Sequence, residues 1–296
     1  MTVEATETDL RPPLHIRLIQ VFAAMWRQPS GKAGLTLLFI HLFVAVFAGL
    51  LVSHNFAAQD AAAIFAKPSA EHWLGADNLG RDVLTRTMLG GRPALITTFF
   101  GTMLALLLGG FLGILLGFIG GTIDDIAMRV VDAFLAIPWL LLLLLIVAIF
   151  GTATFVMVLT LGFLYAVAII RIIRAATLDV VAQDYITAAR TRGERKVTIV
   201  IKELLPNVLD VVLVEGAMRW SWMLLTFSAL SFLGFGVTPP TPDWGLMIAS
   251  SRNFMSVSVW PVAAPMIALS TLIIGLNLSA DALAKALGVD RARIGG

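Results

Sequence analysis

The stretch that decides the fold is QDYITAARTRGERKVTIVIKELLPN, Gln183 to Asn207, which is strongly charged and lies between two long apolar runs. Residues 185–189 are good helix formers, Gly193 interrupts the helix, and an apolar pattern resumes at Ile199 before Pro206. The pattern predicts a short helix–Gly–helix hairpin on the inner face of a membrane. Its exposed cations would be Arg190, Arg192, Arg195 and Lys196.

Two interpretations of this hairpin stay open. Its cations could hold the chain against lipid headgroups on the inner side of the membrane. Alternatively, the hairpin could seat in a groove of another protein. The second interpretation also explains the pair Ala188–Ala189, followed at four residues by Gly193, because small residues let a helix approach its partner closely.

Composition places the chain in a lipid bilayer. It has 296 residues, of which 58% are hydrophobic and 14% charged, with a mean hydropathy of +0.91. A soluble domain would need far more polar surface, so we expect one all-α membrane domain. The absence of cysteine excludes disulfides, thiolate metal sites and thiol nucleophiles. We expect no metal centre, because the four histidines are scattered along the sequence: His15, His41, His54 and His72.

Six apolar runs approach the roughly 20 residues that a helix needs to cross the hydrocarbon core. They cover residues 34–53, 94–119, 133–150, 154–171, 208–234 and 259–284. A tight outer turn is expected at 151–153. With both termini inside, fifteen of the 21 Lys and Arg residues fall in inner segments and five in outer ones. The positive-inside rule therefore predicts six transmembrane helices with cytoplasmic termini.

The expected organisation has three parts. Residues 1–33 form a cytoplasmic tail, whose amphipathic stretch 14–26 suits an interfacial helix. Residues 34–287 form the transmembrane domain, and residues 288–296 form a second cytoplasmic tail. Within the domain, two outer segments, about 54–93 and 235–258, are either an external cap for docking or ordinary loops. The three prolines of the second exclude a regular helix around them: Pro239, Pro240 and Pro242.

The second run carries a glycine at every fourth position. These residues are Gly109, Gly113, Gly117 and Gly121. Small residues on one face let two membrane helices approach closely, so the pattern favours helix packing over a pore-lining role.

The fifth run contains a polar stripe on one helical face: Glu215, Arg219, Trp222 and Thr226. An arginine near the bilayer centre costs about 3 kcal/mol. Glu215, one turn before Arg219, can offset part of that cost. The stripe is either part of a water-filled path for a zwitterionic, peptide-like solute or a structural ion pair against a partner subunit.

Catalytic motifs are missing. The sequence has no phosphate-binding GxxxxGK[ST] loop and no GxSxG elbow. We therefore expect a non-enzymatic chain, in which any active transport draws on an ion gradient or on another subunit. An ion-gradient-driven secondary transporter is the alternative function, and a non-transporting scaffold is a second one.

Three separated motifs resemble the permeases of ABC importers. Tyr185–Asn207 resembles the EAA loop of that family. HWLGADNLGRDVLTR (72–86) and LSFLGFGVTPPTPDWG (230–245) are similar to motifs of the dipeptide/oligopeptide (peptide/nickel) group, in its C-type permease. Shorter matches are Met128, Arg129, Asp132, Ile137 and Pro138.

The resemblance implies a type I ABC-importer permease fold in a bacterial inner membrane. It implies a second homologous permease, two cytoplasmic ATPases that bind ATP and Mg²⁺, and an external solute-binding protein. This chain would hold no cofactor and bind no nucleic acid. The resemblance assigns ATPase coupling to Ala188, Ala189, Arg190 and Gly193. The sequence departs from the family pattern at Thr187, in place of an acidic residue, and at Phe227, in place of a glutamate.

Overall fold

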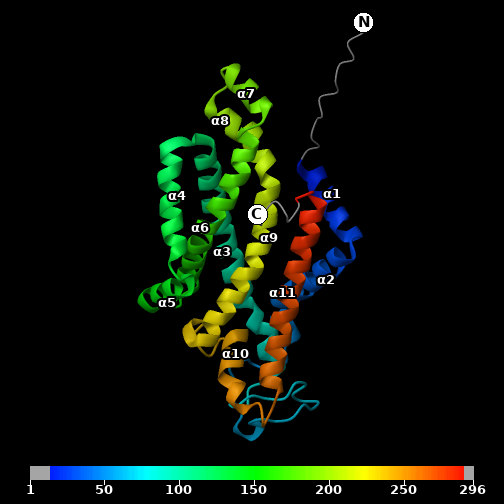
Figure 1. The fold of residues 1–296 in the computed structure, drawn as a ribbon. Helices are drawn as coiled ribbons and strands as arrows, with labels where there is room; N and C mark the ends of the chain where they lie inside the picture. The colour runs from blue at the N-terminus through cyan, green and yellow to red at the C-terminus, as the bar shows by residue number, and fades with distance from the viewer. Residues whose placement is uncertain (1–13, 290–296) are drawn as a thin grey trace.

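The computed structural model describes residues 14–289, and all its regular elements are helices (Figure 1). They are α1 (Leu14–Arg27), α2 (Pro29–Leu51), η1 (Ala61–Ala63), α3 (Val83–Ile119), α4 (Gly121–Ala136), α5 (Trp139–Phe150), α6 (Thr154–Val181), α7 (Asp184–Thr191), α8 (Lys196–Ile199), η2 (Val200–Leu204), α9 (Leu205–Leu230), η3 (Ser231–Phe235), α10 (Trp244–Ser251), η4 (Arg252–Phe254) and α11 (Trp260–Ala286). The predicted all-α class is confirmed for this part of the chain.

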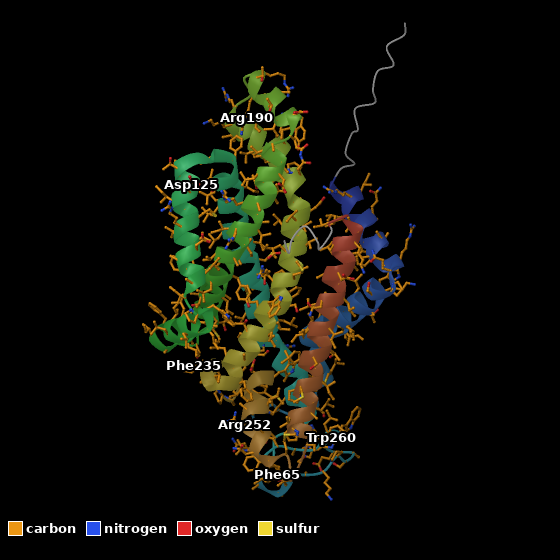
Figure 2. All side chains as sticks on the ribbon, in the orientation of Figure 1. Phe65, Asp125, Arg190, Phe235, Arg252 and Trp260 are labelled. Carbon is orange, nitrogen blue, oxygen red and sulfur yellow. The ribbon has the colours of Figure 1, made fainter. Side chains whose placement is uncertain are left out.

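The long helices α2, α3, α6, α9 and α11 form an elongated bundle, with α3 packed most extensively against α6 and α2 against α11. The hairpin of α7 and α8 projects from one end, whereas α10 and the 52–82 loop lie at the other (Figure 1). Side chains mark the two ends: Arg190 lies at the hairpin, and Phe65 and Arg252 lie at the opposite end (Figure 2).

Four helices are individually long and apolar enough to cross a membrane: α2, α3, α6 and α11. The pair α4 and α5 makes a fifth if it counts as one broken span. The helix α9 has 26 residues, but Glu215 and Arg219 in its middle lower its hydropathy. Length and composition therefore support four to five spans in the described residues, and not the six expected.

The run at 133–150 is not one straight helix, contrary to expectation. The helix α4 ends at Ala136, α5 begins at Trp139, and the two are bent by 82°. Pro138 explains the break, because proline disfavours helical geometry in the residue before it, and Ile137 is extended (φ −76, ψ 132). The expected turn follows, with Gly151 at φ +86 closing α5.

The glycine row holds α3 against α6 at three of its four positions. A Cβ at Gly109 would lie 2.7 Å from the Ile169 Cβ, and one at Gly117 would lie 2.8 Å from the Thr177 Cβ. Gly113 meets α6 in the same way. Gly121 departs from the prediction, because α3 ends at Ile119 and Gly121 is the first residue of α4, with φ +67.

The predicted helix–Gly–helix hairpin is confirmed. The helix α7 ends at Thr191, Gly193 adopts φ +75, and α8 leads through the π-helical turn η2 into α9. The four predicted cations are exposed. The helix expected at 14–26 is α1, and an ion pair between Arg17 and Asp210 ties it to α9.

The two segments predicted to lie outside the membrane, 54–93 and 235–258, contact each other at one end of the bundle, and together we call them the outer cap. The Trp244 indole N–H donates to the Thr87 carbonyl at 2.7 Å, and Gly90 lies directly beneath the Trp244 ring. From the start of α3, the Arg86 guanidinium donates to the carbonyl oxygens of Phe56 (2.8 Å) and Pro240 (3.3 Å). The backbone around the prolines is not helical, and α10 begins immediately after them.

Candidate functional site

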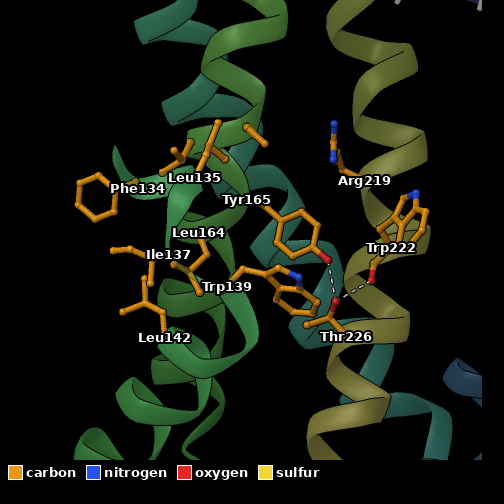
Figure 3. A pocket seen from close by; sticks show the side chains of 12 residues that line it. Phe134, Leu135, Ile137, Trp139, Leu142, Leu164, Tyr165, Arg219, Trp222 and Thr226 are labelled. Atoms are coloured by element: carbon orange, nitrogen blue, oxygen red, sulfur yellow. Dashed lines mark hydrogen bonds between the residues drawn. The ribbon is translucent and has the colours of Figure 1, made fainter. Parts of the chain in front are cut away.

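The candidate site is a half-open cavity of about 280 Å³ between α6, α9 and the bend that joins α4 to α5 (Figure 3). Its walls come from α6, from α9 and from the bend between α4 and α5. The bend contributes apolar side chains such as Phe134, Ile137 and Trp139, and α6 contributes Leu164 and Tyr165. The break at Pro138 is therefore what opens this space.

Three of the four predicted substrate-path residues line the cavity from α9: Arg219, Trp222 and Thr226 (Figure 3). The fourth, Glu215, is not among the lining residues. It is only 1% exposed and forms an ion pair with Arg219. The Glu215 carboxylate thus lies beneath the cavity lining, where it neutralises and orients the Arg219 guanidinium one turn further along the helix.

A hydroxyl network crosses the cavity between α6 and α9. The Thr226 Oγ1 donates to the Trp222 carbonyl at 3.0 Å and lies 2.7 Å from the Tyr165 hydroxyl. Because threonine has a single hydroxyl proton, the Tyr165 O–H is the donor in the second bond. The hydroxyl of buried Thr226 therefore donates one hydrogen bond and accepts another. The bond to Thr226 holds the hydroxyl end of Tyr165 in place.

Tyr165 and the bend residues were missed by the sequence analysis. One signal was available for Tyr165, which is one of two tyrosines in the chain and lies within an otherwise apolar run. A tyrosine in such a run needs a hydrogen-bond partner for its hydroxyl, and the partner here is on α9. The contribution of α4 and α5 depends on the angle between them, which no periodicity reveals.

The chemistry of the cavity is that of a small-molecule site: a mainly apolar and aromatic lining with a few convergent polar groups. The Arg219 side chain keeps 26% of its surface exposed and can offer N–H donors to a carboxylate. Trp222, 60% exposed, presents an indole face beside it. Together these groups can bind an anionic or zwitterionic solute with an apolar side chain.

The four predicted coupling residues have different surroundings. Ala188 is exposed, whereas Ala189 is fully buried within the chain. Arg190 lies over the Phe118 ring at 5.3 Å, a cation–π contact that holds α7 against the end of α3. Gly193 has open space around it. The hairpin is therefore anchored by Ala189 and Arg190, and it presents Ala188 and Gly193 outward.

The histidines are not all scattered in space. His54 and His72 have ring centroids 5.0 Å apart in the outer cap, although 18 positions separate them in the sequence. The expectation of no metal centre used their separation in the sequence alone, and the fold brings this pair together.

Comparison with known proteins gives a consistent family. Residues 109–290 match the family described as binding-protein-dependent transport system inner membrane component. The dipeptide transport system permease protein DppC of Escherichia coli K12 is 37% identical, covering 93% of this chain and 94% of the relative. DppC of Alkalihalophilus pseudofirmus is 32% identical over 90% of this chain and 88% of the relative. The glutathione transport system permease protein GsiD of Pectobacterium atrosepticum is 34% identical over 74% of this chain and 73% of the relative.

The match to the Escherichia coli relative covers 93% of the chain, so it includes the bundle, the cavity and the hairpin. The several long apolar helices are those of a multi-pass membrane protein. The chain belongs to the binding-protein-dependent transport system inner membrane components, as a multi-pass permease subunit of an ABC importer.

Proposed function

We propose that the chain forms half of the translocation path of an ATP-driven importer for peptides or similar small polar solutes. The observation that carries this proposal is the cavity in which Arg219, Trp222 and the Tyr165–Thr226 pair converge. A peptide offers the complementary groups: a terminal carboxylate for the guanidinium and side chains for the aromatic wall.

The named relatives support the solute class. Two are dipeptide permeases and one is a glutathione permease, and both kinds of solute are small, carboxylate-bearing and peptide-like. The buried Glu215 suits this role, because it lets Arg219 remain in a low-dielectric wall without carrying an uncompensated charge.

We propose six crossings with both termini cytoplasmic. Adding the bent α4–α5 pair and α9 to the four apolar helices gives six. The alternation of direction along the bundle supports this count, because α11 ends on the side where α1 lies (Figure 1). The cationic hairpin lies toward the same end, which fits the positive-inside rule. The proposed domains remain 1–33, 34–287 and 288–296.

We propose that the hairpin, residues 183–207, docks in a cleft of a cytoplasmic ATPase. The support is the exposure of Ala188 and Gly193 at the end of the bundle, together with the direct continuation of α8 through η2 into α9. A displacement of α7 would therefore be transmitted to α9, the helix that carries Arg219. ATP and Mg²⁺ would bind the two ATPase partners, a homologous permease would complete the path, and a solute-binding protein would dock on the outer cap.

The alternative, a secondary transporter driven by an ion gradient, requires carboxylates that can exchange protons or bind cations. The three candidates within or near the spans are already paired: Asp210 with Arg17, Glu215 with Arg219 and Asp281 with Lys285. This pairing disfavours ion coupling through them.

Reconstitution into liposomes distinguishes the two. We expect uptake of a labelled dipeptide only when this chain, the partner permease, the ATPases, the solute-binding protein and ATP are all present. Uptake by this chain alone under a proton or sodium gradient would reject the importer proposal.

A further inference from the structure

Two histidines and an aspartate meet in the outer cap, at the end of the bundle opposite the hairpin. One potential ligand atom from each of His54, His72 and Asp82 lies within 4.8 Å of the other two. The Asp82 carboxylate and the His72 Nδ1 are 2.9 Å apart. His72 and Asp82 are buried, and His54 is partly buried. This cluster is separate from the cavity that contains Arg219.

The donor set and its spacing fit a zinc-type ion. Imidazole nitrogen and carboxylate oxygen are both ordinary zinc ligands, at about 2.0–2.1 Å from the ion. Two such ligands at a tetrahedral angle are about 3.3 Å apart. The His72–Asp82 pair is already near that separation. Rotation of the partly buried His54 side chain can bring its ring nitrogen to a similar distance from the other two ligand atoms.

The cluster also opens onto a small cavity of about 70 Å³, whose lining includes His54, Asp82 and Glu71. This space is enough for an ion with one or two waters, given that a water occupies about 30 Å³. The fourth coordination position would therefore be open to a water molecule or to Glu71 at the cavity wall.

The three residues come from different elements. His54 follows the end of α2 at Leu51 by three residues, His72 lies in the following loop, and Asp82 is the N-cap of α3. The second Asp82 oxygen accepts from the Thr85 backbone N–H at 2.7 Å, so it fixes the carboxylate to the first turn of α3. An ion here would join the outer ends of two long helices.

We propose that His54, His72 and Asp82 form a binding site for a divalent transition metal, with Zn²⁺ as the fitting ion. The bound ion would replace the hydrogen bond between His72 and Asp82, releasing its proton, and would clamp the outer end of α2 to the start of α3. The inference is independent of the proposed solute and of the coupling hairpin.

The test is a calorimetric titration of Zn²⁺ into the full chain in lipid nanodiscs, purified without a histidine tag. We expect one zinc ion per chain and a higher temperature of thermal unfolding with zinc. His54→Gln should weaken zinc binding about 100-fold. His41→Gln removes a histidine whose ring bonds to the carbonyls of Leu37 and Ala268 and not to the cluster, so it serves as the matched control and should bind zinc as the unaltered chain does.

Asp82→Asn provides a second variant, because asparagine preserves the helix cap while removing the charged ligand. It should also lose the zinc-dependent rise in unfolding temperature but retain the unfolding temperature without metal. Stoichiometric zinc binding that survives both substitutions, or no zinc binding by the unaltered chain, would overturn the proposal.

Discussion

The hydroxyl groups of Tyr165 on α6 and Thr226 on α9 are 2.7 Å apart, which joins two helices across the wall of the candidate cavity. This bond fixes the distance between the aromatic ring and the α9 face that also carries Arg219. It lies where a solute would have to pass in the proposed path, so its loss should be measurable in transport as well as in stability.

Removing one hydroxyl of this pair tests that role. Tyr165→Phe is expected to destabilise the chain by about 1 kcal/mol and to raise the KM for dipeptide uptake about 5-fold. Thr226→Val should have a similar effect. Thr226→Ser retains the hydroxyl and is the matched control, measured by thermal unfolding and by uptake in proteoliposomes. If Tyr165→Phe and Thr226→Val take up the dipeptide as well as Thr226→Ser and the unaltered chain do, the pair has no role in the path.

Replacing Arg219 by Leu is expected to abolish dipeptide uptake, because the cavity loses its cation. The same change leaves Glu215, 1% exposed, without its partner, at a cost of about 3 kcal/mol. The double variant Glu215→Gln/Arg219→Leu should regain most of that stability without regaining uptake. Unfolding temperature and basal ATPase activity of the assembled complex provide the controls. Wild-type uptake by the double variant would show that the pair is only structural.

The contact between α3 and α6 makes a sharp prediction about glycine. A Cβ at Gly113 would lie 2.8 Å from the Ile173 Cβ, so Gly113→Ala should force the helices apart at a cost of about 1–3 kcal/mol. Gly110, on the same helix, has no atom within 4 Å of its Cβ position, and Gly110→Ala should not destabilise the chain. Thermal unfolding in detergent compares them, and identical unfolding temperatures would contradict the packing role.

Docking of the hairpin on an ATPase can be tested by crosslinking. Ala188 is exposed and Ala189 is fully buried, so a cysteine at 188 should crosslink to the ATPase in the assembled complex, and a cysteine at 189 should not. The native chain has no cysteine, so the background is clean. Failure of the 188 cysteine to reach an ATPase under any nucleotide condition would argue against docking at this surface.

The outer cap should respond to pH through Asp243. Burial raises the pKa of this carboxyl from its ordinary 3.8 to about 6, opposed in part by the Leu246 backbone N–H that donates to it at 3.1 Å. The folded state therefore favours the protonated form, and this contribution is complete below pH 4 and lost as pH rises through 6.

Asp243→Asn keeps the helix cap without the charge. Between pH 4 and pH 7 the unaltered chain should lose about 2 kcal/mol more stability than this variant. Thermal unfolding at the two pH values measures the difference. A variant as sensitive to pH as the unaltered chain would show that another group is responsible.

The sequence alone determined the local features. Gly193, with no Cβ, interrupts the hairpin at a left-handed turn, and the four cations around it are exposed because charge stays out of the apolar bundle. The spacing of Gly109, Gly113 and Gly117 predicted a close helix contact, since residues four apart share one face. Glu215 and Arg219 pair for the same reason. Each of these depends on neighbours within one or two helical turns.

Only the tertiary structure decided which distant residues meet. Tyr165 joins Thr226 across 61 positions, and His54 approaches His72 through the path of an irregular loop. The 82° bend after α4 depends locally on Pro138, but its direction, and therefore the cavity, depends on how α4 and α5 pack against α6. Side-chain patterns specify which face of a helix is apolar or polar, whereas the packing of whole helices sets the partner that each face finds.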